Sequence, residues 1–423
     1  MVEQAWLTSQ RWFAGKARPL GALSAVASER LGDATITLLQ VAYRDGGPDE
    51  LYQLAGTPDT VDALSDGAIQ ASLYEAIRDE RTAGPLHCDR YLDLEPAPPS
   101  RLLSAEQSNS SIAFGQRWIL KLYRRIASGE SRDLEVGRFL AQARFAHSPA
   151  IAGAISYFET TLAVLQEFAS NSGDGWTYVL EQLQAPNAPD DVFWASHALT
   201  DHEVLLDSIE RLGHITGELH AALASRTDVP DFAPEPAAGD DLDSWLADLR
   251  QQVQAAGSRA ESWLRGGDRD LEARLAGAYE DLDPAGVLKI QIHGDYHLGQ
   301  VLKTADGFKI IDFEGEPARP LAERRAKQPA LRDVAGMLRS LHYAAYTAGN
   351  EAWASTAGDR FLAGWLEGSD GRFVASDEAA TQRLLTLFQL AKAFYELNYE
   401  LNNRPEWVAV PARGIERLLE QLA

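Results

Sequence analysis

Two short polar motifs constrain this chain more than any other feature. Residues 293–300 read HGDYHLGQ, and residues 310–314 read IIDFE. The first motif carries Asp295 with the amide of Gln300 five positions on, and the second carries Asp312 at the end of a short apolar run. Phosphoryl transfer from ATP needs one carboxylate to orient the attacking hydroxyl. A second carboxylate and a neutral oxygen donor are needed to hold magnesium. The motifs therefore indicate a phosphoryl-transfer site, and the alternative is a pair of unrelated surface aspartates.

Protein kinases use the same logic in their H-R-D-x-x-x-x-N and D-F-G motifs. In this chain Gly294 stands in place of the arginine, Gln300 in place of the asparagine and Glu314 in place of the last glycine. A histidine in such a loop braces it through hydrogen bonds, so neither His293 nor His297 is expected to be the base. The apolar runs before each aspartate favour buried strands that end at a shared site.

Composition limits the classes of partner. The formal net charge of −23 argues against a nucleic acid or an anionic membrane as partner. No stretch approaches the roughly 20 apolar residues that span a bilayer, and residues 1–15 lack the apolar core of a signal peptide. The single cysteine, Cys88, fits a reducing cytosol. We expect a cytoplasmic protein with a small-molecule substrate, and the oligomeric state stays open.

The order of strand and helix patterns predicts an α+β, two-lobe, protein-kinase-like fold. Strand-like runs at 31–43 and 50–54 flank a turn, and a proline-rich segment at 95–100 reads as a linker. Further strands follow at 111–115 and 117–123, and amphipathic helices dominate from about residue 200. The predicted parts are an N-terminal cap, a β-rich nucleotide-binding lobe and a helical lobe with the catalytic and sugar-binding residues, at 1–95, 96–200 and 201–423.

Lys121 is the candidate phosphate-binding cation. It ends an apolar strand, where burial of its charge is costly unless an anion pairs with it. In a kinase such a lysine contacts the α- and β-phosphates and pairs with a helix carboxylate. Glu135, in the following helix, is the expected partner. The alternative is a surface lysine on an edge strand and a solvated glutamate.

Two further segments are candidates for ATP binding. A polar loop without glycine precedes the strand of Lys121, and Ser108 and Ser110 could offer donors to phosphate there. Gln166, Glu167 and Phe168 end a buried strand at the position where the two lobes of a kinase join, and we expect their backbone to bind adenine. The alternatives are an ordinary polar loop and an ordinary strand end.

Sugar contacts are expected in a segment near the C-terminus that is rich in carboxylates, amides and aromatic rings. Its candidates are Glu396, Tyr399, Glu400 and Asn402, and next to Asp295 we add Tyr296 and His297. Glu396 and Glu400 share one helix face at i, i+4, so their like charges need a compensating arginine or ligand. The alternative is a solvated helix end stopped by Pro405.

These motifs, in this order, resemble those of the maltokinase family, in the aminoglycoside-phosphotransferase-like branch of the protein-kinase-like fold. The resemblance covers nearly the whole chain, including the RWFAGKAR segment near its start. It implies an N-terminal cap, a β-rich intermediate lobe and a helical C-lobe, with ATP and Mg²⁺ as cofactors. It also implies that Asp295 is the catalytic base, that Gln300 and Asp312 hold magnesium, and that Lys121 contacts the phosphates while Glu135 pairs with it.

The resemblance leaves the acceptor sugar open. Maltokinases phosphorylate the 1-hydroxyl of maltose, and a related actinobacterial group phosphorylates glucosamine to glucosamine 6-phosphate. Many maltokinases carry an arginine where Asn402 stands, and its loss leaves a more negative surrounding that suits an ammonium group. We therefore expect glucosamine, with maltose as the alternative. An aminoglycoside phosphotransferase and a catalytically silent nucleotide- or sugar-binding protein are the remaining alternatives.

Overall fold

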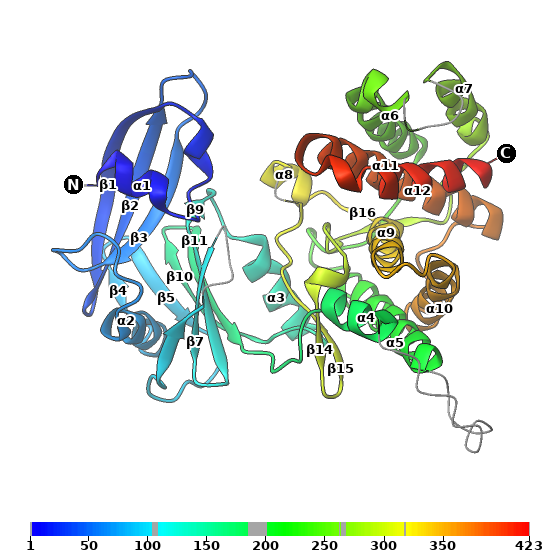
Figure 1. Ribbon diagram of the computed structural model, residues 1–423. Coiled ribbons are helices and arrows are strands. Elements are labelled where there is room, and N and C mark those ends of the chain that lie inside the picture. The colour runs from blue at the N-terminus through cyan, green and yellow to red at the C-terminus, as the bar shows by residue number, and fades with distance from the viewer. Residues whose placement is uncertain are drawn as a thin grey trace. The chain divides into compact units, whose positions relative to one another are not determined.

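A computed structural model describes residues 2–103, 109–184, 201–261, 263, 268–316 and 319–422. The chain forms two compact units. Unit 1 comprises residues 1–142 and 148–170, and unit 2 comprises residues 143–147 and 171–423. Sheets dominate unit 1 and helices dominate unit 2, so the predicted α+β composition is confirmed (Figure 1).

The first part of unit 1 is an antiparallel sheet in the order β1-β2-β3-β9. The strands are β1 (Leu20–Leu31), β2 (Ala34–Tyr43), β3 (Glu50–Gly56) and β9 (Arg125–Ile126), preceded by α1 (Gln4–Ser9) and the 3₁₀ helix η1 (Ala14–Ala17). Buried and exposed residues mostly alternate along β2, as expected for a strand with one face in the core. Trp12 and Phe13, from the segment that resembled the maltokinase cap, pack into this core.

A seven-stranded sheet forms the rest of unit 1, in the order β4-β5-β10-β11-β8-β7-β6. Its strands are β4 (Thr82–Ala83), β5 (Leu86–Arg90), β6 (Ser100–Leu102), β7 (Asn109–Phe114), β8 (Trp118–Tyr123), β10 (Ile151–Tyr157) and β11 (Thr160–Glu167). Two helices accompany the sheet, α2 (Gly67–Arg78) and α3 (Arg132–Gln142). The Asp66 side chain accepts a hydrogen bond from the Ala68 backbone and thereby caps the start of α2.

Unit 2 is mainly helical. Its longer helices are α4 (Gly175–Gln184), α5 (Asp201–Leu223), α6 (Gly239–Glu261), α7 (Asp268–Tyr279), α9 (Leu331–Thr347), α10 (Trp353–Gly368), α11 (Glu378–Asn403) and α12 (Ala409–Glu420). The short elements are η2 (Leu298–Gln300), α8 (Leu321–Arg324), η3 (Pro405–Trp407), β12 (Glu235–Pro236), β13 (Leu288–Ile290), β14 (Val301–Thr304), β15 (Gly307–Ile310) and β16 (Gln328–Pro329). Helix α11 packs against α6, α9 and α12 (Figure 1).

Helices α5 and α10 pack with their backbones in direct contact. A Cβ atom at Gly213 would clash with the carbonyl of Phe361, and one at Gly364 would clash with that of Glu210. Glycine is therefore required at this crossing. The close packing brings His220 of α5 and Trp365 of α10 together near Asp333, at the start of α9.

The predicted elements correspond well to the observed ones. The runs at 31–43, 50–54 and 117–123 become β2, β3 and β8. The predicted cap at 1–95 lies wholly within unit 1, and β9 extends the cap sheet with residues of the predicted β-rich lobe. The boundaries between the three predicted parts stay a prediction.

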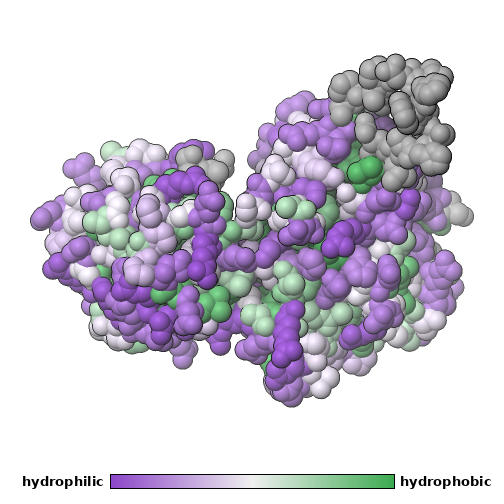
Figure 2. Space-filling view, turned by 90° about the horizontal axis from the view of Figure 1, so that it is seen from below, coloured by the Kyte–Doolittle hydropathy of each residue, from purple (hydrophilic) through white to green (hydrophobic). Residues whose placement is uncertain are grey.

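The face shown in Figure 2 is largely hydrophilic, and its apolar residues occur in small patches. This distribution agrees with the strongly negative net charge. Among the described residues, no helix combines the length and the apolar character needed to cross a membrane.

Candidate active site

The loop that carries Asp295 is anchored by Asp333. This carboxylate, at the start of α9, accepts backbone N–H groups from His293 at 2.7 Å and from Gly294 at 2.9 Å. Asp333 is buried, so these hydrogen bonds are not diluted by solvent. Gly294 has φ of +87°, a conformation that glycine adopts without strain. The anchored turn fixes the backbone directly before Asp295.

Asp333 is itself held by residues from α5 and α10. His220 Nε2 lies 3.1 Å from its carboxylate, and Trp365 Nε1 donates to His220 Nδ1 at 2.9 Å. Because Nδ1 accepts from Trp365, the proton of a neutral imidazole sits on Nε2 and is donated to Asp333. Burial opposes ionisation of Asp333, but the bonds from His220 and Gly294 outweigh it and lower the pKa of the carboxyl. The loop is therefore supported by an ionised carboxylate.

His293 connects the two predicted motifs. Its Nε2 donates to the carbonyl of Ile311 at 2.9 Å, and its Nδ1 accepts the backbone N–H of Asp295 at 3.4 Å. The ring is fully buried and packs against Tyr296 and Phe313. One imidazole thus links the Asp295 loop to the residue before Asp312, which is the bracing role expected of a histidine here.

Gln300 and Asp312 lie together, as the sequence predicted. Gln300 Nε2 is 3.2 Å from Asp312 Oδ2, and the Ile311 N–H donates to the Gln300 carbonyl at 3.0 Å. Asp312 has φ of +66°, a left-handed conformation that costs about 1–3 kcal/mol at a residue other than glycine. Backbone strain of this kind gathers at functional sites. Carboxylate and amide oxygens are the ligands Mg²⁺ prefers, so this donor set fits a magnesium ion.

In unit 1, Lys121 pairs with Asp133. Its Nζ lies 2.9 Å from Asp133 Oδ2, and the Tyr123 hydroxyl donates to the same oxygen at 3.3 Å. Both charged side chains are largely buried. The ion pair that Lys121 needed is therefore present, with Asp133 as a partner that was not predicted from the sequence. Glu135 lies two residues further along α3, and its pairing with Lys121 stays a prediction.

The other nucleotide candidates also lie in unit 1, except that Ser108 falls outside the described residues. The Ser110 hydroxyl accepts a hydrogen bond from Arg124 Nε at 2.8 Å. Gln166 and Glu167 end β11, and the Phe168 N–H donates to the Arg117 carbonyl at 2.7 Å. The chain passes from unit 1 to unit 2 at residues 170–171. The segment thus ends directly before that boundary, and its contact with adenine stays a prediction.

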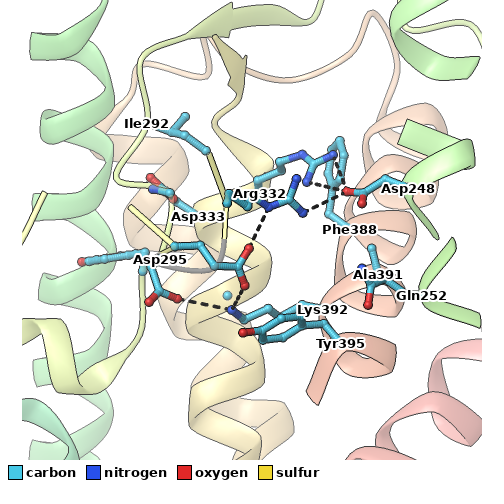
Figure 3. Close-up of a pocket in the computed structure, with 15 residues that line it drawn as sticks. Asp248, Gln252, Ile292, Asp295, Arg332, Asp333, Phe388, Ala391, Lys392 and Tyr395 are labelled. Atoms are coloured by element: carbon cyan, nitrogen blue, oxygen red, sulfur yellow. Dashed lines mark hydrogen bonds and ion pairs between the residues drawn. The ribbon is translucent and has the colours of Figure 1, made fainter. Parts of the chain in front are cut away.

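A pocket of about 80 Å³ opens beside Asp295 within unit 2 (Figure 3). Its walls come from five segments, which are α6, the loop that carries Asp295, the segment after Asp312, α9 and α11. Among the described lining residues, four carry carboxylates and three carry cations. These charged residues are Asp248, Asp295, Glu316 and Asp333, and Arg319, Arg332 and Lys392.

Lys392, from α11, forms an ion pair with Asp295. Its Nζ lies 3.3 Å from Asp295 Oδ1 and 3.7 Å from Glu316 Oε1, and it sits 4.8 Å from the centre of the Tyr395 ring. Burial lowers the pKa of Lys392, but the charges of Asp295 and Glu316 outweigh this effect and raise it above the ordinary value. Lys392 therefore remains an ammonium and holds two carboxylates in one place.

A second ionic cluster forms the far wall of the pocket. Asp248 Oδ2 lies 3.2 Å from both terminal nitrogens of Arg332 and 3.3 Å from Arg319 Nη2. Arg319 also donates to Glu316 at 2.7 Å. Burial lowers the pKa of Arg332, although Asp248 opposes the change. Arg319 thus connects Asp248 to Glu316, and Lys392 connects Glu316 to Asp295.

The predicted sugar-binding residues near the C-terminus are engaged elsewhere. Glu396 accepts two hydrogen bonds from the buried Arg339, at 2.8 and 3.0 Å. Glu400 is buried and accepts two from Arg404, at 2.7 and 2.9 Å. An arginine was one of the two groups expected to offset the repulsion between Glu396 and Glu400, and Arg404 is such an arginine. Burial raises the pKa of Glu400, and Arg404 opposes that shift.

The remaining sugar candidates also lie apart from the pocket or use other partners. Tyr399 is about half exposed, and the Asn402 amide donates to the Asn398 carbonyl and accepts from Arg259. Tyr296 lines the pocket, but its hydroxyl pairs with Thr216 at 2.8 Å. His297 Nδ1 accepts the Gly299 N–H. The residues predicted for this role that do not belong to the described pocket lining are His297, Glu396, Tyr399, Glu400 and Asn402.

Several residues that line the pocket were not predicted from the sequence. Lys392 precedes Tyr395 and Glu396 by three and four positions in α11, so helical spacing from the candidate segment could have found it. Glu316 lies two residues after Glu314, beyond the end of the IIDFE motif. Asp248 sits in α6 with no local motif, and only the tertiary fold brings it to Arg332.

Comparisons with known proteins identify the family of this chain. Residues 100–315 match the phosphotransferase enzyme family, and residues 6–79 match the maltokinase N-terminal cap domain. The chain belongs to the phosphotransferase enzyme family. This confirms the resemblance and the class of enzyme inferred from the two aspartate motifs.

Proteins named glucosamine kinase resemble this chain in sequence and in fold. The chain is 29% identical over 352 residues to the glucosamine kinase of Streptacidiphilus jiangxiensis, covering 77% of this chain and 75% of that protein. It is 27% identical over 356 residues to the glucosamine kinase of Mycolicibacterium smegmatis, covering 77% of this chain and 81% of that protein. A glucosamine kinase structure aligns over 99% of this chain and 98% of that chain, with a TM-score of 0.74 and 23% identity. A complex of glucosamine kinase with glucosamine, ADP and inorganic phosphate aligns over 99% of each chain with a TM-score of 0.73. The predicted kinase-like fold is therefore confirmed.

Proposed function

We propose that this protein is an ATP-dependent kinase that transfers the γ-phosphoryl group to a hydroxyl of glucosamine, giving glucosamine 6-phosphate. The observation that carries the proposal is the pocket at Asp295, where the catalytic carboxylate lies against Lys392 and Glu316 in a loop anchored by Asp333. Two sequence relatives named glucosamine kinase support the choice of substrates, and so does the similar structure of a glucosamine kinase in complex with glucosamine, ADP and inorganic phosphate.

Asp295 orients and deprotonates the acceptor hydroxyl. The hydroxyl oxygen attacks the γ-phosphorus, a new O–P bond forms, and the bond from the γ-phosphorus to the β–γ bridging oxygen breaks to release ADP. The hydroxyl proton passes to an Asp295 oxygen. Anchoring by Asp333 and His293 keeps that carboxylate in place, which matters because this chemistry depends mainly on positioning and electrostatics.

Gln300 and Asp312 are the residues that would hold magnesium, which supplies charge neutralisation for the β- and γ-phosphates. Lys121, paired with Asp133, is positioned on β8 as a phosphate-binding cation in unit 1. Gln166, Glu167 and Phe168 are the proposed adenine contacts, because their strand ends directly before the boundary between the units. Ser110 is proposed to act through the backbone, since its hydroxyl is taken by Arg124.

The charges of the pocket favour an amino sugar. Its described lining has one more carboxylate than cations, and an ammonium group would balance that excess. A charge-assisted hydrogen bond to Asp248, Glu316 or Asp295 contributes about 1.5–3 kcal/mol. Recognition of the ammonium in the pocket is further supported because the carboxylates of Glu396 and Glu400 are already paired with arginines.

The test is an ADP-release assay with ATP and Mg²⁺ against glucosamine, glucose, maltose and kanamycin. Glucosamine should exceed glucose by about tenfold in kcat/KM, the equivalent of one charge-assisted hydrogen bond. ³¹P NMR of the product distinguishes a 6-phosphate from a 1-phosphate. The Asp295→Asn variant is the control, and it should bind nucleotide while losing transfer.

Each contrary result has a defined meaning. Preference for maltose would make the protein a maltokinase. Preference for kanamycin would make it an aminoglycoside phosphotransferase. Absence of transfer to all four acceptors by a folded, nucleotide-binding protein would contradict the kinase assignment. Full turnover by Asp295→Asn would remove Asp295 from the role of base.

A further inference from the structure

A second cavity lies among the helices of unit 2 and shares none of the described lining residues of the Asp295 pocket. It measures about 170 Å³ and is enclosed by α9, α10, α11 and α12. One water needs about 10–15 Å³ of such space, so the cavity has room for a small organic molecule. Its described polar lining residues are His342, Ser355, Asp359, Gln382, Gln389, Arg417 and Gln421.

The polar side chains of this cavity form no hydrogen bonds or ion pairs with one another or with other described residues. Gln389 is only 5% exposed, and the Nδ1 atom of His342 is buried without a partner. Buried polar groups are normally satisfied, and each exception needs an explanation. A ligand at the inner end of the cavity would offer partners to the buried groups of Gln389 and His342.

The inner part of the cavity carries a guanidinium and an imidazole. Arg417 from α12 and His342 from α9 line it, and Arg339 lies close enough to both to disfavour their charged forms. Burial, followed by the charge of Arg339, lowers the pKa of Arg417. Among the described residues Arg417 forms no ion pair, although the more distant charge of Glu351 opposes the lowering of its pKa. These groups suit an oxyanion, because guanidinium binds carboxylate and phosphate through paired N–H donors.

The outer part of the cavity has a different chemistry. Ser355 and Asp359 on α10, Gln382 on α11 and Gln421 directly after α12 are exposed at its rim. A hydroxyl, a carboxylate and two amides are groups that exchange hydrogen bonds with sugar-like hydroxyls. The cavity is therefore polarised, with cationic and imidazole groups inside and groups that bind hydroxyls outside.

We propose that this cavity binds a small hydroxylated organic anion, with its carboxylate or phosphate on Arg417 and His342 and its hydroxyls toward Asp359 and Gln382. The proposal is independent of the kinase assignment, because none of these residues belongs to the Asp295 pocket. Two helices contribute residues to both the cavity and the Asp295 pocket. Helix α11 carries Gln389 and Lys392, and helix α9 carries His342 and Asp333.

Isothermal titration calorimetry of the full chain tests the proposal, with glucose 6-phosphate, gluconate and inorganic phosphate as probes. We expect a Kd of about 1 mM or tighter for at least one of the first two probes. Tighter binding of glucose 6-phosphate would identify a phosphate ligand, and tighter binding of gluconate would identify a carboxylate. Binding of inorganic phosphate with equal strength would contradict the role of the hydroxyl-binding rim.

Variants separate this cavity from the active site. Arg417→Gln removes the guanidinium and should weaken binding by at least about tenfold. Ser355→Trp fills the rim without a change of charge and should have the same effect, which covers the case in which Arg417→Gln does not fold. Arg413→Gln is the matched control: Arg413 lies one turn earlier on α12, is exposed and pairs with Glu351, so its removal should leave binding unchanged.

Binding lost in Arg417→Gln and Ser355→Trp but kept in Arg413→Gln would support the proposal. Equal binding in all of these proteins would place the probe at another site and overturn the proposal. The same holds if the wild-type chain binds neither organic probe.

Discussion

The ammonium of Lys392 lies 3.3 Å from a carboxylate oxygen of Asp295, although the two residues are 97 positions apart. Helix α11 thus supplies a cation to the Asp295 loop, which belongs to a distant part of the sequence. The same ammonium lies 3.7 Å from Glu316. One lysine therefore fixes the spacing of two carboxylates that would otherwise repel each other.

Lys392→Met should lower kcat about 10- to 100-fold and leave the KM for ATP nearly unchanged. The variant keeps the length of the side chain but removes the charge that positions Asp295, and positioning is the main source of rate in this chemistry. It also makes the pocket more negative, so the preference for glucosamine over glucose should increase. Steady-state kinetics with each sugar measure both effects.

The control for this variant is Lys327→Met, because Lys327 pairs with Glu235 outside the pocket. Equal losses in the two variants would mean that the effect is not specific to the Asp295 pair. An unchanged kcat in Lys392→Met would contradict its positioning role.

Asp333→Asn should reduce kcat about 100-fold and lower the free energy of unfolding by about 3 kcal/mol. An amide can offer one oxygen, whereas the carboxylate now accepts from His293, Gly294 and His220, and hydrogen bonds to a charged group contribute about 1.5–3 kcal/mol each. Urea unfolding and the assay measure the two losses. Asp281→Asn, at an exposed position, is the control. Native stability together with native kcat would show that the loop does not need this anchor.

Lys121→Ala should raise the KM for ATP about tenfold and lower kcat, because it removes a cation proposed to contact the phosphates. Asp133→Asn should change both constants in the same direction, since it removes the partner 2.9 Å from the Lys121 ammonium. Glu135→Gln decides between the two carboxylates of α3. If Glu135→Gln impairs ATP use and Asp133→Asn does not, Glu135 is the functional partner.

The sequence predicted local features of the site well, because they depend on local spacing. Asp295, Gln300 and Asp312 lie within one short stretch, and the hairpin between the last two brings their side chains to 3.2 Å. Lys121 was found from the cost of burying a charge at the end of an apolar strand. The choice between Asp133 and Glu135 required the rotation of α3 relative to β8, which no spacing rule supplies.

The residues that line the pocket could not be predicted from local spacing. Asp248, Arg332 and Lys392 come from three helices, and their contacts depend on how α6, α9 and α11 cross. Composition correctly marked the end of α11 as charged and aromatic. It could not show that Arg339, which is buried in α9, takes the Glu396 carboxylate.

Glu396→Ala should destabilise unit 2 by about 3–5 kcal/mol, because it leaves the buried Arg339 guanidinium unpaired. The KM for glucosamine should change little at a temperature where the variant is folded. Tyr399→Phe, at an exposed position of the same helix, should leave stability nearly unchanged. A stable Glu396→Ala protein with a much higher KM for glucosamine would restore Glu396 to the sugar site.

The stability of the protein should depend on the protonation of His342. Burial, Arg339 and Arg417 lower the pKa of His342 well below its ordinary value, and Asp359 on α10 lines the same cavity. Below pH about 6.5 the unfolded chain binds a proton at this residue, whereas the folded chain does not. The free energy of unfolding should therefore fall, by up to about 1.4 kcal/mol per pH unit from this group, as the pH decreases from 6.5 toward the lowered pKa.

His342→Gln isolates this contribution, because glutamine does not titrate while the other groups remain. The difference in unfolding free energy between wild type and His342→Gln should be constant above pH about 6.5 and should move against the wild type below it. Arg417→Gln should make the acid-dependent part smaller, since removal of a neighbouring cation raises the pKa of His342 toward its ordinary value. A difference that does not vary with pH would mean that His342 takes up a proton as readily in the folded protein as in the unfolded chain, and hence that the cavity is open to water at its inner end.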